Sequence, residues 1–148
     1  GMPTRVTSSG RMRGEVVEYW NTLFQFGDPA LAVHAQSGVI NQQGRSFTHA
    51  YEIHLEQATL MFDFAVVGDQ PVVAMPLTVL DHEGQALKPD LPEGDPMLAA
   101  FEAELTEVSK CIESNTPSQL LGANLARDAI VLCQKQTESV VKGEPVAV

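Results

Sequence analysis

The chain has few basic residues, few cysteines and no long apolar run, and each shortage excludes a class of protein. Nine Lys and Arg against 19 Asp and Glu give a formal net charge of −10 at pH 7. Phosphate backbones and anionic membranes repel such a chain, so we expect neither nucleic acid nor a membrane as a partner. Two cysteines in 148 residues are too few for a secreted disulfide scaffold. With no secretory leader pattern and no apolar run near ~18–20 residues, the sequence indicates a cytoplasmic protein.

The composition is otherwise that of an ordinary globular chain, with 44% hydrophobic and 19% charged residues. The length of 148 residues predicts a single domain over residues 1–148. Gly1 directly before Met2 is typical of a residue left after tag removal. This start leaves two interpretations open, a complete short gene product or an excised domain.

Strand patterns occupy the first two-thirds of the chain and helix patterns the last third. Residues 17–26 and 47–56 alternate between apolar and polar side chains, as strands with one buried face do. Residues 72–80 predict an edge or bulged strand, because Pro71 and Pro76 donate no ladder hydrogen bond. The order predicts an α+β fold, an antiparallel-rich open sheet of about five to six strands with two C-terminal helices packed on one face.

Two helices are predicted after the proline-rich loop 81–96. Asp95 as N-cap and Pro96 as first residue open the first helix. Its expected buried stripe is Phe101, Leu105, Val108 and Ile112. Ser118 is the expected cap of a second helix that runs to about Lys142. The apolar stripe expected for that helix is Leu121, Leu125, Ala129, Leu132 and Cys133.

The sequence contains no catalytic motif, no Gly-rich phosphate loop and no metal-ligand spacing, so we expect no catalytic, cofactor-binding or metal residues. His49 and His54 are five residues apart in one predicted strand, so they point to opposite faces and cannot share a metal ion. His49 lies on the face of Tyr51 and Ile53. It is either a half-buried structural histidine or a polar group in a substrate pocket or interface.

The sheet face away from the helices is more apolar than a hydrated sheet needs. It is expected to carry Tyr19 and Leu23 from one strand and Thr48 and Ala50 from another. This mixture predicts an interface on the sheet face, with a second copy of the chain or with another domain.

Four segments together carry a family resemblance. They are the opening strand 3–10, the hairpin 23–33, the strand pair 47–62, and the closing helices 101–112 and 121–148 with the tail residues Ser139, Gly143 and Val146. They resemble the C-terminal domain of the Gfo/Idh/MocA family of oxidoreductases, named after glucose–fructose oxidoreductase and inositol dehydrogenase. The turn Leu55–Leu60 departs from the family pattern, because it lacks the two glycines that supply unusual backbone conformations.

The resemblance implies a homodimer through the sheet face and a nicotinamide cofactor, NAD or NADP, on a Rossmann domain that this sequence lacks. That domain would be joined in cis or supplied in trans. Tyr51 matches a tyrosine that faces the sugar or polyol in some relatives. The leading hypothesis is thus a substrate-side and oligomerisation domain of an NAD(P)-dependent sugar or polyol oxidoreductase, inactive alone.

Two other hypotheses remain. One is a stand-alone small-ligand binding or scaffold protein that uses the exposed sheet face around Trp20, His49 and Tyr51. The other is a small lyase or isomerase with His49 and Asp63 as its acid–base pair.

Overall fold

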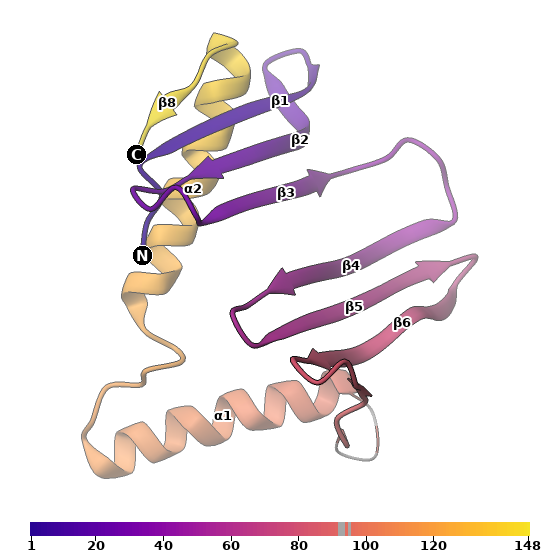
Figure 1. Cartoon of the computed structure of the whole chain (residues 1–148). Helices are drawn as coiled ribbons and strands as arrows, with labels where there is room; N and C mark the ends of the chain where they lie inside the picture. Colours follow the sequence, from indigo (N-terminus) through magenta and orange to yellow (C-terminus); the bar gives the residue numbers. More distant parts are fainter. Residues whose placement is uncertain (92–93, 95) are drawn as a thin grey trace. The chain divides into compact units, whose positions relative to one another are not determined.

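The computed structural model describes residues 1–91, 94 and 96–148. These residues form β1 (Arg5–Arg13), β2 (Val16–Gln25), β3 (Ala32–Gly38), β4 (Arg45–His54), β5 (Ala58–Val67), β6 (Gln70–Asp81), β7 (Ala86–Leu87), α1 (Pro96–Ser114), α2 (Ala123–Lys142) and β8 (Val146–Ala147) (Figure 1). The predicted α+β class is confirmed. The chain divides into two compact units, Gly1–Val39 with Met97–Val148 (unit 1) and Ile40–Pro96 (unit 2).

The strands form two antiparallel sheets where the sequence predicted one sheet of five to six strands. Sheet A has the order β3-β2-β1-β8 and belongs to unit 1, and sheet B has the order β4-β5-β6-β7 and belongs to unit 2. Side-chain alternation shows which residues share a face, but it does not show which strands pair. The two-residue strand β7 is also too short to produce a periodic pattern.

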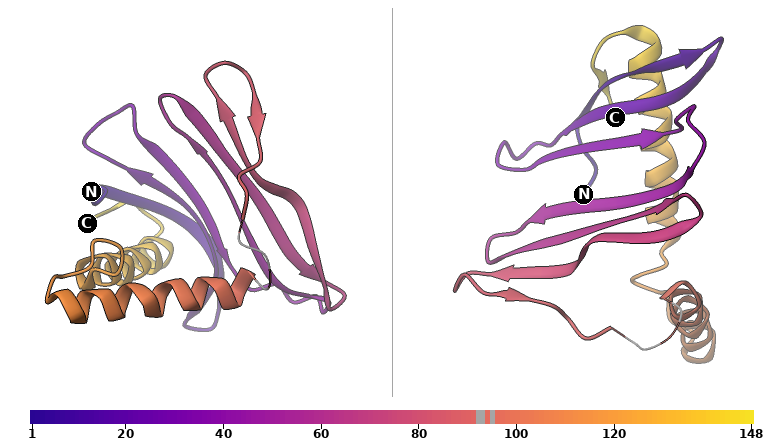
Figure 2. Two further views of the ribbon diagram at one scale, coloured as in Figure 1. Left: turned by 90° about the horizontal axis from the view of Figure 1, so that it is seen from below. Right: turned by 90° about the vertical axis from the view of Figure 1, so that its right-hand side faces the viewer.

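Helix α2 covers one face of sheet A and closes the core of unit 1. It lies across β1 and β2 (Figures 1 and 2). Val6, Phe24 and Val146 form the buried cluster, and Leu132 of α2 packs against them. Gly10 of β1 lies close to both β2 and α2, since a Cβ there would lie 2.2 Å from the carbonyl oxygen of Tyr19 and 3.1 Å from Val140 Cγ2. A side chain at position 10 has no room, so glycine is required.

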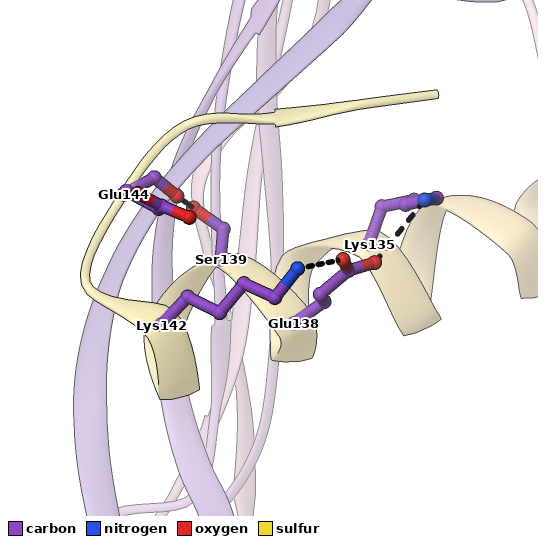
Figure 3. Close-up of polar contacts among 5 residues, drawn as sticks. All are labelled: Lys135, Glu138, Ser139, Lys142 and Glu144. Carbon is purple, nitrogen blue, oxygen red and sulfur yellow. Dashed lines mark hydrogen bonds and ion pairs between the residues drawn. The ribbon is translucent and has the colours of Figure 1, made fainter.

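A buried polar network also joins α2 to sheet A. Ser139 is fully buried, accepts a hydrogen bond from the backbone N–H of Ser8 at 2.9 Å and donates one to the carbonyl of Glu144 at 2.7 Å. Figure 3 shows the second of these contacts. Gln136 donates to the hydroxyl of buried Thr22 at 2.9 Å, and that hydroxyl contacts the Ser8 hydroxyl at 2.8 Å. Each of these polar groups is paired, as burial requires.

The predicted buried stripe of α2 is therefore wrong. Of the predicted stripe, Leu121, Leu125, Ala129 and Cys133 are exposed and only Leu132 contacts the core. The buried positions are Gln136 and Ser139, because hydrogen bonds to sheet A satisfy them. The helix begins at Ala123, since the hydroxyl of Ser118 instead accepts the backbone N–H groups of Leu120 and Leu121 in a preceding turn.

The predicted burial of the α1 stripe is also wrong. Leu105 is 67% exposed and Ile112 is 74% exposed, and Phe101 and Val108 are exposed as well. Within unit 1, α1 packs against neither sheet A nor α2, so the fold prediction of two helices on one sheet face holds for α2 alone. The predicted N-cap Asp95 lies outside the described residues.

Sheet B is a single layer. Apart from Pro96, the described part of unit 2 contributes only strands and loops, and Thr78 is its one buried residue. The predicted irregularity of β6 is confirmed: its pairing with β5 shifts on either side of Asp63, near Pro76. Only Val79 and Leu80 of β6 pair with β7, so the rest of the strand is a sheet edge.

Candidate functional site

Five rings gather on one face of β4 and β5, which we call the aromatic face: Phe47, His49, Tyr51, Phe62 and Phe64. The antiparallel register places His49 opposite Phe64 and Tyr51 opposite Phe62. Ring centroids lie 5.7 Å apart for His49–Phe62 and for Tyr51–Phe62, and 6.2 Å apart for Phe47–Phe64. The rings are tilted, as aromatic pairs prefer. The predicted alternation of β4 thus places His49 and Tyr51 side by side, with ring centroids 5.8 Å apart.

Aliphatic side chains extend this face to the ends of the sheet. Ile53 pairs with Leu60, Leu60 pairs with Val79, and Phe64 pairs with Val73, so these residues share the face of the rings. Phe47 is 55% exposed, and Ile53 and Val73 are also exposed. The aromatic face is therefore an apolar surface open to solvent, with an imidazole and a phenol as its polar groups.

The opposite face of β4, on which the sequence predicted an interface with Thr48 and Ala50, is mostly polar and carries His54, so the apolar face of this sheet is the aromatic face instead. The Nε2 of His54 lies 3.2 Å from a carboxylate oxygen of Glu52, and its Nδ1 lies 3.3 Å from the hydroxyl of Thr59. His49 and His54 point to opposite faces, as predicted. Among the described residues, no group of three or more His, Cys, Asp or Glu side chains could hold a metal ion.

The third predicted site residue, Trp20, lies in unit 1. It pairs with Gly10 of β1 in the register that places Ser8 opposite Thr22, so it shares the face that α2 covers. Its indole Nε1 is buried and has no hydrogen-bond partner among the residues that the structure describes. The structure therefore brings His49 and Tyr51 together and places Trp20 in the helix-covered sheet of the other unit.

Among the described residues, the shifted pKa values belong to residues of α2 in unit 1. Hydrogen bonds from Lys142 and Lys135 lower the pKa of Glu138, and Glu138 in turn raises the pKa of Lys142. Figure 3 shows the carboxylate between the two ammonium groups, at 2.7 Å from Lys142 and 3.1 Å from Lys135. These residues form an ion-pair network on the helix surface, which stabilises the helix.

Comparisons of the chain with protein-family models, with curated proteins and with solved structures find no match. The helices among the described residues are too short or too polar to cross a membrane. The functional argument therefore depends on the geometry of the two sheets.

The structure gives a physical role to each residue of the tail motif. Ser139 joins β1 to the carbonyl of Glu144, Gly143 ends α2 in the left-handed conformation with φ 68°, and Val146 is buried in the core of unit 1. These roles hold the C-terminal strand β8 against β1. The sequence did not predict the roles of Ser8 and Thr22 in the polar network with Gln136 and Ser139, because small hydroxyl residues in strands have no periodic signature.

Proposed function

We propose that this chain is an oligomerisation and substrate-side domain, of the kind found in the C-terminal half of NAD(P)-dependent sugar or polyol oxidoreductases. Two copies associate through the aromatic face of sheet B. The chain alone catalyses no reaction. The nicotinamide cofactor is held by a Rossmann-type domain in cis or in trans.

The observation that carries this proposal is the single layer of sheet B. A stable domain buries the apolar face of each sheet against a second layer. In unit 2 the described residues supply no second layer, although one face carries five rings and several aliphatic side chains. A second sheet of the same kind supplies the missing layer in a symmetric, self-complementary contact.

The size of the face suits a dimer contact. Strands β4 and β5 have ten residues each, which gives a length of roughly 33 Å at ~3.3 Å per residue. Three strands at ~4.8 Å spacing add roughly 14 Å of width, so the flat area is about 460 Å². Side chains that project from the sheet raise the accessible area of the face above this flat value, toward the ~800 Å² per partner of a standard interface.

Light scattering on the purified chain tests the proposal. The chain should have the mass of a dimer at about 100 µM, and Phe47→Glu should make it a monomer, because a buried unpaired carboxylate opposes association. The matched control is Thr48→Glu, one residue away on the opposite face, which should remain dimeric. A strictly monomeric chain, or equal behaviour of the two variants, would contradict the proposal.

A second measurement tests the proposal that this chain has no nicotinamide site of its own. Because ligand that binds only the folded chain raises Tm, neither NAD nor NADP should shift the melting temperature. A clear, saturable shift with either nucleotide would contradict the assignment of the cofactor to another domain.

A second candidate function is supported by the pairing of His49 and Tyr51. Exposed rings with an imidazole and a phenol group beside them can stack on the apolar side of a sugar and hydrogen-bond its hydroxyls. Calorimetric titration with sugars and polyols distinguishes this function. Saturable binding by the monomeric Phe47→Glu chain, lost in His49→Ala, would favour a small-ligand binding module over a dimer face.

A further inference from the structure

Helix α1 carries a continuous apolar stripe whose spacing is that of a helix–helix contact. The residues are Leu98, Phe101, Leu105, Val108 and Ile112, at intervals of three, four, three and four. This alternation places all five on one side of the helix, as in positions a and d of a heptad. All five side chains are exposed. Within unit 1, α1 packs against neither sheet A nor α2, and only the loop that follows the helix, with Pro117 and Leu121, approaches the Val108 and Ile112 end of the stripe.

Both borders of the stripe are acidic. At 100° per residue, Glu102 and Glu113 lie along one border of the stripe and Glu104 lies along the other. The single basic residue of the helix, Lys110, lies about 80° around the helix from Glu102, on the side away from the stripe. A shallow hollow follows the Glu102 border, and its lining includes Phe101, Leu105 and Glu113, with Lys110 on the side away from the stripe.

We propose that this stripe docks an amphipathic helix of another protein whose apolar side is bordered by Lys and Arg. The apolar residues supply the contact area, and the acidic borders select a basic partner and speed its encounter. A second copy of α1 would bring acidic borders together, and like charges across an interface oppose association. The proposal rests on α1 alone and is independent of the sheet B interface.

Binding of a designed peptide to the full chain tests the proposal. The probe is a fluorescent 21-residue peptide with Leu at positions a and d and Lys at e and g, and its partner probe has Glu at e and g. Fluorescence anisotropy should show the Lys peptide binding at least about tenfold more tightly than the Glu peptide. Raising the salt concentration should shrink that ratio, because the selective contribution is electrostatic.

Variants of the chain locate the binding surface. Leu105→Glu should weaken the Lys peptide at least about tenfold, because it places a charge in the middle of the apolar contact. The matched control is Leu120→Glu, which changes an equally exposed leucine just beyond α1 and should leave binding unchanged. Equal binding of the two peptides, or equal loss in the two variants, would overturn the proposal.

Two further readouts decide the occupant of the stripe. A fall of the chain's own Tm by several degrees in Leu105→Glu would show that the stripe is buried within the chain itself. If the chain is a dimer that becomes a monomer in Leu105→Glu but remains a dimer in Phe47→Glu, a second copy of the chain occupies the stripe. Either result would overturn the proposed basic partner, whereas an unchanged Tm and mass with loss of peptide binding supports it.

Discussion

Sheet A and sheet B are both four-stranded and antiparallel, yet only sheet A has an apolar face that its own unit covers. Sheet A has α2 on one face, a buried cluster around Val6 and Phe24, and a polar network that joins helix to strands. Its other face carries mostly polar pairs, such as Ser9 with Asn21. Sheet B has the longer paired strands and more aromatic residues, but the described part of unit 2 buries only Thr78.

The difference shows that apolar residues stabilise a sheet only when a second layer removes them from water. Helix α2 does this for sheet A with few large side chains, because its hydrogen-bonded serine and glutamine fit close to the strands. The rings of sheet B contact one another along the face, and they are either exposed, as Phe47 and His49 are, or half-buried. Sheet A is therefore complete within unit 1, and sheet B is suited to association.

Truncating one phenylalanine in each sheet gives the largest expected difference. Phe24→Ala removes a ring from the closed core and should cost about 3–5 kcal/mol of the free energy of unfolding. Phe47→Ala removes an exposed ring and should change it by less than about 0.5 kcal/mol in the monomer. Urea denaturation at low protein concentration measures both. Equal losses would remove the distinction between the sheets, by showing that the aromatic face is buried in the monomer.

Removing the Ser139 hydroxyl has a smaller effect, and it tests whether the polar network holds sheet A to α2. Ser139→Ala leaves the N–H of Ser8 and the carbonyl of Glu144 without this partner, which should cost about 1–3 kcal/mol. Ser109→Ala is the control, because its hydroxyl also bonds a carbonyl but on exposed α1. Chemical denaturation of both variants should show a loss for Ser139→Ala alone. If both variants are neutral, the network contributes nothing.

Much of the strand structure could be predicted from sequence, and the packing could not. Alternation in β4 placed His49, Tyr51 and Phe47 on one face, because the strand period of two fixes side-chain direction. The same kind of argument failed for α1 and α2. A helical stripe such as Phe101 and Leu105 shows which side is apolar, but not whether anything in the chain covers it.

The candidate site was predicted in part for the same reason. Local alternation brought His49 and Tyr51 together, since they lie two residues apart in one strand. Trp20 was grouped with them because all three lie on apolar sides of predicted strands. Which sheet each strand joins depends on long-range pairing that the periodic pattern does not contain, and Trp20 belongs to sheet A.

The smallest expected effect concerns the surface of α2 that points away from this packing, where Glu138 lies between Lys135 and Lys142. The lowered pKa of Glu138 means that the pair stabilises the folded chain above the usual carboxyl pKa near 4.5, and that this contribution is lost as pH falls through the lowered pKa. The raised pKa of Lys142 means that its contribution is present below its usual value near 10.5 and is lost as pH rises through the raised pKa. Lys142→Ala should therefore lower Tm slightly at pH 7 and leave it unchanged at strongly acidic pH.

Lys110→Ala, on exposed α1, is the control for the loss of one positive charge. In 1 M salt most of the Tm difference between Lys142→Ala and the original chain should disappear, because salt screens exposed ion pairs. An NMR titration of the Glu138 carboxyl carbon should show its pKa rising in Lys142→Ala. A Tm difference that persists at acidic pH would instead assign the role of Lys142 to packing of its aliphatic stem. In that case the outer surface of α2 would also stabilise unit 1 by burying apolar atoms. The difference between the covered sheet A and the uncovered sheet B would then involve more of α2 than the face that contacts the strands.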